Sequence, residues 1–382
     1  MNDKDKTSSA LDIIRLVSCA VNNETPDKRI CERTDMSGLL KTASNHSLRA
    51  AAAFALEKVT VLPEDFREAK YKAVRRSALF NFERNAVLNA LENNKIRYMT
   101  LKGIVLRECY PKTSMREMSD NDILCDENRM SDVRSVMESL GFLCKSYEKS
   151  HHDIYSKPPQ LYFEMHRSLF DRDNEPEFYA YFMNIWDKAV RNDNNGYGYH
   201  LTNDDMYIYL ICHLYLHYRT KGTGLRSLLD IYVFNKKYRD CLDRGYIEAE
   251  LKKLELNRFE RKIRELSEKT FTAQPLSEDE LDELSFFILS TTHGTMDNYL
   301  ANHLNNDDSV GTKTKYALSR LFPSRENLRT THPFVYNHMG IYPLWILYRP
   351  VKGAVKYPKK MSGEIKRLIR FRKKDNMGEF NK

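Results

Sequence analysis

Apolar residues recur at helical spacing along the first quarter of the chain. The first stripe consists of Leu11, Ile14, Val17 and Val21. These positions fall on one face of a helix with about 3.6 residues per turn. A second stripe starts after Pro63 and ends near Asn94, and proline suits the first helical turn because its missing N–H would have no partner there. We therefore expect residues 1–94 to form a helical region with an apolar core.

The hydrophobic pattern changes after position 95. Strand-forming residues alternate with others over residues 96–101, which predicts a first strand. Further strands are expected at 120–125, 142–147, 154–157 and 161–166, with helices at 104–109 and 129–140. This order of elements is typical of a small mixed domain. The sequence thus predicts an α+β protein whose mixed-sheet domain, residues 95–170, lies between two helical regions.

The chain returns to helical patterns after the predicted sheet domain. Residues 171–361 are expected to form a second helical region, with a loop or edge hairpin at 191–201 and helices that begin at Asn203 and Leu225. Residues 362–382 are expected to form a basic amphipathic tail. The apolar residues of this tail are Ile365, Leu368, Ile369 and Phe371. The basic face of such a tail is either solvated or binds an anionic membrane surface or nucleic acid.

The composition predicts a folded chain with a reducing environment. Of 382 residues, 41% are hydrophobic and 30% are charged, which excludes a disordered chain. The net charge of +8 is compatible with a nucleotide partner. The seven cysteines contain no Cys-x-x-Cys pair, which argues against a disulfide framework and favours a cytoplasmic location. The polar first residues predict no secretory signal, and the longest apolar run, near 341–347, is too short for a transmembrane segment.

Acidic residues gather on the predicted strands. Asp120 and Asp122 are two residues apart, so their side chains project from the same face of a strand. Two adjacent carboxylates favour a cation between them, and Mg²⁺ is commonly held by carboxylates together with substrate phosphates. Glu164 lies on a later alternating strand. It would complete a two-metal site that activates an attacking hydroxyl and stabilises a leaving pyrophosphate.

Two cations precede the aspartates along the chain. Lys102 forms a turn with Gly103 after the first predicted strand, and Arg116 lies in the polar loop ahead of Asp120. Arginine contacts phosphate through two parallel hydrogen bonds, whereas lysine acts as a point charge. Lys102 and Arg116 are therefore candidates for neutralising the charge of a bound phosphate.

The combination of these motifs resembles the polymerase-β-type nucleotidyltransferase superfamily. Its order here is Lys102 and Gly103, then Arg116 ahead of Asp120 and Asp122, then a strand with Glu164 and His166. More narrowly, residues 96–170 are similar to the branch described as uncharacterised nucleotidyltransferases. The resemblance implies a mixed sheet of about five strands with flanking helices. It also implies transfer of a nucleoside monophosphate from a nucleoside triphosphate (NTP) to an acceptor, with release of pyrophosphate.

The same resemblance implies roles for single residues. Gly103 would sit in the turn that cradles the triphosphate. Asp120 and Asp122 would bind two Mg²⁺ ions, for which Mn²⁺ is an alternative. Glu164 would bind the catalytic ion and help to deprotonate the acceptor, and His166 would contact substrate or hold Glu164.

The resemblance extends more weakly to two later helices, which would pack beside the nucleotide site. His213, His217, Arg226 and Asp230 are therefore candidate substrate contacts. The residues alone also allow two core or interface histidines and an ion pair between Arg226 and Asp230 on one helix face. A helical metallohydrolase built on His213, His217 and Asp230 is a further hypothesis.

Another histidine pair, His151 and His152, precedes the strand predicted at 154–157. Adjacent strand residues point to opposite faces of a sheet, so the two imidazoles are not expected to share a metal ion. We expect this pair in a loop or at the sheet edge.

Two departures from the family pattern support an alternative function. Gly103 is followed by Ile104, and Asn121 stands where the family usually has an apolar residue between the aspartates. A buried Asn needs hydrogen-bond partners. The alternative is a catalytically degenerate module of the same fold that binds a nucleotide or a partner.

The sequence does not name the acceptor. A small molecule, a saccharide and a protein side chain are all compatible with a hydroxyl-bearing acceptor. Nucleic acid is not favoured, because aromatic residues are not interleaved with the basic residues of the tail as single-strand binding requires.

Overall fold

The computed structural model describes residues 3–193, 196–292, 294, 300, 304, 309–323, 328, 333–356 and 358–370. The chain divides into two compact units. The first unit contains Met1–Tyr215 and Gly224–Thr292, and the second contains Leu216–Thr223 and His293–Lys382. The candidate catalytic residues of the sheet domain all belong to the first unit.

The first unit begins with helices, as the sequence predicts. They are α1 (Asp3–Asn22), α2 (Arg29–Arg33), α3 (Met36–Asn45), α4 (Arg49–Leu56) and α5 (Glu64–Asn93). Pro63 precedes α5 as its N-cap, and Glu64 and Asp65 lie in the first turn, where carboxylates interact favourably with the helix dipole. The alanine-rich α4 is buried except for its first residue. Its small side chains allow the helix to pack closely against α1 and α5.

A seven-stranded mixed sheet follows, in the order β3-β4-β5-β2-β1-β7-β6. Its strands are β1 (Tyr98–Thr100), β2 (Asn121–Cys125), β3 (Leu143–Ser146), β4 (His152–Lys157), β5 (Leu161–His166), β6 (Val190–Arg191) and β7 (Gly198–His200). This confirms the predicted α+β fold. The sheet exceeds the five strands that the resemblance implied because the hairpin of β6 and β7 extends it, with β7 pairing in parallel with β1.

Short helices connect the strands. They are α6 (Lys102–Leu106), η1 (Arg107–Cys109), η2 (Thr113–Met115), η3 (Glu127–Arg129) and α7 (Met130–Ser139). Asp126 accepts a hydrogen bond from the amide of Asn128 at the start of η3, and Gly141 adopts a left-handed conformation with φ of 82° after α7. Asp126 marks the start of this helical segment and Gly141 marks its end, as the sequence predicts.

One face of the sheet carries the core of the predicted domain. Helices α5 and α7 contribute Val87, Leu91, Val133 and Met137, which pack with strand residues such as Ile123, Phe163 and Met165. Phe142 and Phe163 meet edge to face, with ring centroids 5.0 Å apart. Because strand residues alternate between faces, the neighbours of Phe163 and Met165 point away from this core.

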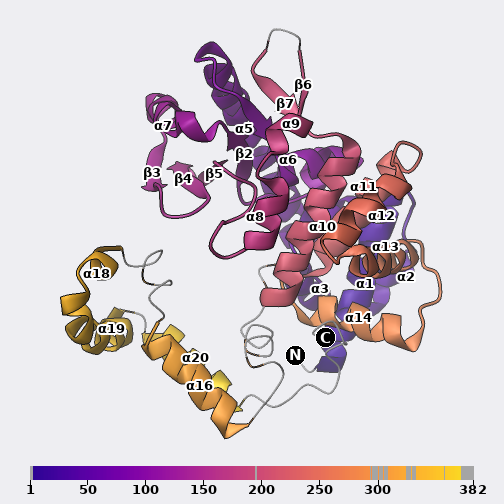
Figure 1. Ribbon diagram of the computed structural model, residues 1–382. Coiled ribbons are helices and arrows are strands. Elements are labelled where there is room, and N and C mark those ends of the chain that lie inside the picture. The colour runs from indigo at the N-terminus through magenta and orange to yellow at the C-terminus, as the bar shows by residue number, and fades with distance from the viewer. Residues whose placement is uncertain are drawn as a thin grey trace. The chain divides into compact units, whose positions relative to one another are not determined.

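The remaining helices of the first unit follow the sheet. They are α8 (Pro176–Phe182), α9 (Ile185–Lys188), α10 (Asn203–Thr220), α11 (Leu225–Tyr238), α12 (Arg244–Lys253), α13 (Asn257–Phe271) and α14 (Glu278–Leu289), and the last residues of α10 belong to the second unit. Helices α11 and α13 pack side by side (Figure 1). They bury apolar residues from both helices, including Leu229, Val233, Ile263 and Leu266.

The described part of the second unit is helical. Its elements are α16 (Val310–Leu321), α18 (Pro333–Asn337), η4 (Met339–Ile341), α19 (Tyr342–Lys356) and α20 (Pro358–Arg370). Helix α20 confirms the predicted helix in the basic tail but starts four residues before position 362, and residues 371–382 lie outside the described residues. Ile365 and Ile369 are exposed on α20. Among the described residues, no helix combines the length and hydropathy needed to cross a bilayer.

Candidate active site

The register of two parallel strands brings the predicted carboxylates together. Strand β2 pairs with β5 so that Asp122 lies opposite Glu164 and Leu124 lies opposite His166. On β5, Phe163 and Met165 are buried in the core, and Glu164 and His166 occupy the other face, as predicted. A parallel pair of strands thus converts two distant motifs into one cluster.

Asp122 is a buried carboxylate with two cationic or polar partners. Its Oδ1 atom lies 3.1 Å from Nζ of Lys102 and 3.1 Å from Nε2 of His166. Burial alone would raise the pKa of Asp122, but the Lys102 ammonium and the hydrogen bond to His166 lower it well below its usual range. Conversely, burial would lower the pKa of Lys102, but the charge of Asp122 raises it. Both groups therefore stay ionised and form a buried ion pair.

The other two carboxylates, Asp120 and Glu164, have pKa values that shift in opposite directions. Asp120 precedes β2, and burial together with the charges of Asp122 and Glu164 raises its pKa to about 6. Burial would also raise the pKa of Glu164, but a hydrogen bond with His166 lowers it. Oε2 of Glu164 lies 3.6 Å from Nε2 of His166. The crowding of three carboxylates produces a local negative potential that favours a cation.

Donor atoms suited to a divalent cation converge here. Among the described residues, Asp122, Glu164 and His166 each offer an atom within 4.8 Å of the other two. Carboxylate oxygens suit Mg²⁺ and Mn²⁺, and imidazole suits transition metals. The donor set therefore fits a divalent ion. This group contains His166 in place of Asp120, so the set of Asp120, Asp122 and Glu164 expected from the resemblance stays a prediction.

The turn after β1 has a different geometry from the one expected. The left-handed residue is Lys102, with φ of 41°, rather than Gly103. The glycine is needed for close approach, because a Cβ atom at Gly103 would lie 2.9 Å from Nη1 of Arg116. The side chain of Lys102 points into the site and reaches Asp122.

Arg116 binds a carboxylate of the chain itself. Its Nε and Nη2 atoms donate to the two oxygens of Asp230 at 2.8 and 2.9 Å, and the hydroxyl of Tyr110 donates to Oδ1 of Asp230 at 2.7 Å. The alternative of an ion pair between Arg226 and Asp230 is therefore not the arrangement found, since Asp230 pairs with Arg116. Arg226 instead donates to the carbonyl of Glu117 at 2.9 Å. Helix α11 thus holds the loop that leads into β2.

Among the described residues, neither histidine of α10 belongs to a group of side chains that could hold a metal ion. The ring of His213 lies 6.2 Å from that of Tyr209, a buried residue beside Lys102. His217 is exposed and belongs to the second unit. The carboxylate of Asp230 is engaged by an arginine and a tyrosine. These placements favour two core or interface histidines over a metallohydrolase site built on them.

Asn121 is fully buried, as its family position requires. Its Oδ1 atom accepts a hydrogen bond from Nη1 of Arg84 on α5 at 3.2 Å. The parallel register of β2 with β5 is regular at Asn121 and Asp122. The carbonyl oxygen of this polar residue thus has a partner on the core helix, whereas its buried Nδ2 atom has no hydrogen-bond partner among the described residues.

Sequence reasoning missed His151 and His152 as members of the site. Their rings lie 4.6 Å apart, and both contact His166. The expectation of opposite faces is wrong because His151 precedes the first residue of β4 and is not bound by strand alternation. The sequence signal was the pair itself, placed directly before a strand that pairs with β5.

A cationic pocket next to the site was also missed. This cavity of about 310 Å³ is lined on one side by residues of the loop before Asp120 and by Tyr162. Its cations are Arg49, Lys72, Arg76, Arg107 and Arg116. The sequence signal was the spacing of Lys72 and Arg76, four residues apart on a helix that was interpreted as plain core.

Comparison with known proteins agrees with the geometry of the site. A family model described as an uncharacterised nucleotidyltransferase matches residues 32–272 of the 382. No curated protein and no solved structure gave a match. The matched region contains every residue of the candidate site, and the chain belongs to the family of uncharacterised nucleotidyltransferases.

Proposed function

We propose that the protein is a metal-dependent nucleotidyltransferase that moves a nucleoside monophosphate from an NTP to a hydroxyl-bearing acceptor and releases pyrophosphate. The observation that supports this proposal is the convergence of Asp122, Glu164 and His166 from two parallel strands, in a chain of a nucleotidyltransferase family.

The carboxylates would hold divalent cations. We propose Mg²⁺, with Mn²⁺ as the alternative, held by Asp122 and Glu164 with Asp120 completing a second position. Such ions would supply charge neutralisation for the triphosphate and activation of the attacking hydroxyl. Glu164 would accept the proton of the acceptor hydroxyl, because its side chain is the more exposed of the paired carboxylates, at 25% against 7% for Asp122.

The cationic pocket supports an anionic substrate. Five cations line it, of which Arg116 is paired with Asp230 and Arg49 with Glu117, the one carboxylate in the lining. Arg76 is fixed there by hydrogen bonds from Nε to the carbonyl of Met118 and from Nη2 to that of Ser119, at 2.9 and 3.0 Å. Guanidinium groups held in this way are suited to phosphate. We propose that the pocket binds a phosphate-bearing part of a substrate.

We further propose that residues 95–170 act as the catalytic core and that the helical regions position it. Helix α5 holds Asn121 through Arg84, and α11 holds Arg116 through Asp230. Arg116 precedes the aspartates in the sequence, and Asn121 lies between them.

The test is calorimetric titration with each of the four common NTPs and Mg²⁺, which needs no knowledge of the acceptor. Asp122→Ala is avoided, because it would leave buried Lys102 without its partner. Glu164→Gln and Asp120→Asn keep size and remove charge. We expect each to weaken Mg²⁺-dependent NTP binding roughly tenfold or more, about 1.4 kcal/mol.

Glu127→Gln is the matched control, since Glu127 is exposed at the start of η3 outside the site. It should bind NTP as the wild type does. The proposal would be refuted by NTP binding that does not depend on Mg²⁺ and has the same affinity in the wild type and both variants. Binding that depends on both, without pyrophosphate release with any acceptor, would favour the degenerate binding module.

A further inference from the structure

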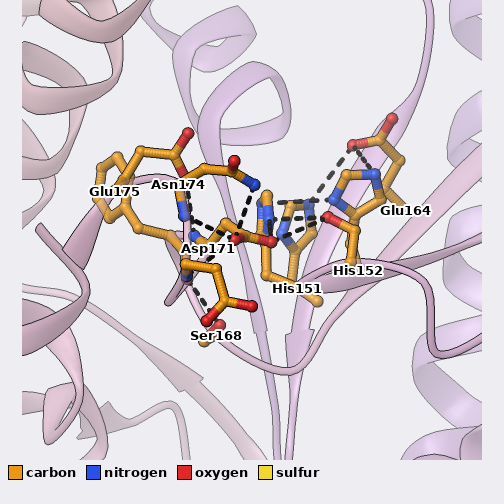
Figure 2. Close-up of polar contacts among 11 residues, drawn as sticks. His151, His152, Glu164, Ser168, Asp171, Asn174 and Glu175 are labelled. Atoms are coloured by element: carbon orange, nitrogen blue, oxygen red, sulfur yellow. Dashed lines mark hydrogen bonds and ion pairs between the residues drawn. The ribbon is translucent and has the colours of Figure 1, made fainter. Parts of the chain in front are cut away.

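Three histidines meet on the sheet face that carries Glu164. His152 on β4 lies opposite His166 on β5, and His151 precedes β4. The ring centroids are 4.6 Å apart for His151 and His152, 5.0 Å for His152 and His166, and 5.4 Å for His151 and His166. One nitrogen from each ring lies within 4.8 Å of the other two. Figure 2 shows His151 and His152 beside Glu164.

Each of these rings has one nitrogen near a carboxylate. Carboxylates that accept a hydrogen bond from the ring orient metal-binding histidines in proteins. Asp122 is within hydrogen-bond distance of His166, whereas Nδ1 of His151 forms its hydrogen bond with the hydroxyl of Ser150 at 3.2 Å. The three pairs are His151 Nδ1 with Asp171 Oδ2 at 3.7 Å, His152 Nε2 with Glu164 Oε2 at 3.8 Å, and His166 Nε2 with Asp122 Oδ1 at 3.1 Å.

The opposite nitrogens are the ones suited to a shared ligand. Nε2 of His151 and Nδ1 of His152 share a hydrogen bond of 3.3 Å, which a bound ion would replace. Two nitrogens that each lie about 2.05 Å from a tetrahedral zinc ion are separated by roughly 3.3 Å. Nδ1 of His166 is buried and has no hydrogen-bond partner among the described residues. A buried polar atom without a partner is costly, and a cation bound at this nitrogen would remove that cost.

The carboxylate behind His151 is itself held in place. Asp171 Oδ1 accepts hydrogen bonds from the amides of Asp173 and Asn174, both at 3.0 Å, and from the side chain of Asn174 at 2.9 Å. Figure 2 shows Asp171 between Asn174 and His151. A carboxylate fixed by the backbone leaves Oδ2 directed at the imidazole. The support of His151 is therefore preorganised.

The charge state of the cluster suits a dication. Metal ions bind the neutral form of imidazole, and each ring has one carboxylate beside it, that of Asp171, Glu164 or Asp122. Around the rings, three carboxylates outnumber the single ammonium of Lys102.

We propose that His151, His152 and His166 bind a divalent transition-metal ion such as Zn²⁺, at a site beside that of the harder cation proposed at the carboxylates. His166 belongs to both groups of donor atoms. Imidazole ligands suit zinc and related ions, whereas oxygen ligands suit Mg²⁺. The proposal is independent of nucleotidyl transfer. It holds equally for a chain that binds no nucleotide.

The test is metal titration of the full chain after removal of bound metal with a chelator. Co²⁺ is followed by its visible absorption and Zn²⁺ by calorimetry, in the wild type and in the His151→Gln/His152→Gln double variant. Because the chain has seven cysteines that also bind these ions, the difference between the two proteins is the readout. We expect the wild type to bind one more ion per chain, with an affinity at least 100-fold above any residual site of the double variant.

Two further variants sharpen the result. His200→Gln removes an exposed histidine that contacts Asn192 and should leave metal binding unchanged. Asp171→Asn should weaken binding about 10- to 100-fold without changing the number of ions, since it removes only the carboxylate behind His151. Circular dichroism establishes that each variant is folded. Equal Co²⁺ and Zn²⁺ binding by wild type and double variant, or none by wild type, overturns the proposal.

Discussion

Removal of the carboxylate of Asp230 should destabilise the first unit strongly. Its side chain and that of Arg116 are 9% and 8% exposed, and two hydrogen bonds of 2.8 and 2.9 Å join them. Asp230→Ala leaves the Arg116 guanidinium buried without a counter-ion. Breaking a buried pair in this way costs about 3–5 kcal/mol. The variant also removes the acceptor of the Tyr110 hydroxyl, so we expect the upper half of this range.

The matched control removes both charges. Replacing a buried pair by apolar residues of similar volume is often close to neutral. Arg116→Met/Asp230→Leu should therefore be more stable than Asp230→Ala, although it carries one more substitution. The remaining cost of about 1–3 kcal/mol is that of the Tyr110 hydroxyl left without its acceptor.

Urea unfolding provides the measurement, with linear extrapolation to water. The chain has two tryptophans, of which Trp186 lies in the first unit and Trp345 in the second. A Trp345→Phe background makes the fluorescence report on the first unit alone. A cost below about 1 kcal/mol for Asp230→Ala, or a double variant as unstable as the single one, would refute the view that this pair is a buried structural contact.

Two further predictions concern buried positions near the same elements. His46 is 2% exposed, accepts a hydrogen bond from the amide of Leu225 at 3.2 Å, and has its pKa lowered by burial to about 4. Since an unfolded histidine titrates near 6.5, the first unit should lose about 2 kcal/mol of unfolding free energy between pH 7 and pH 5 from this residue, a loss that urea unfolding of His46→Asn should not show. Gly103→Ala should cost about 1–3 kcal/mol, because its Cβ would press on Nη1 of Arg116. In thermal unfolding, Gly103→Ala should have a lower Tm than the control Gly245→Ala, because a Cβ at Gly245 has room. Equal Tm values for the two variants would contradict the clash.

Local patterns were sufficient to predict the centre of the site. Alternation along the chain places Glu164 and His166 on one face of a strand and Asp122 on the matching face of another. The period change near residue 95 and the Gly at position 141 set the bounds of the sheet elements. These features depend only on neighbours in sequence, so they can be read without the fold.

The contacts that the sequence could not predict join residues far apart. Arg116 and Asp230 are separated by 114 positions, and no local rule distinguishes this pair from the expected i,i+4 pair with Arg226. The histidine cluster depends on where β4 begins, and a shift of one residue decides whether His151 joins His152. Boundaries of this kind are set by tertiary pairing with β5.

The helical regions fix the position of the loop before Asp120. Helices α4, α5 and α11 hold this loop through arginine contacts that join residues up to 109 positions apart in sequence. The contacts are Arg49 Nη2 to Glu117 Oε2 at 2.5 Å, Arg76 Nε to the carbonyl of Met118 at 2.9 Å, and Arg226 Nη1 to the carbonyl of Glu117 at 2.9 Å. A loop held from three helices keeps its conformation when a charged substrate binds. The family match over residues 32–272 includes all three helices. This is expected if the function requires the sheet together with the loop and the helices that hold it.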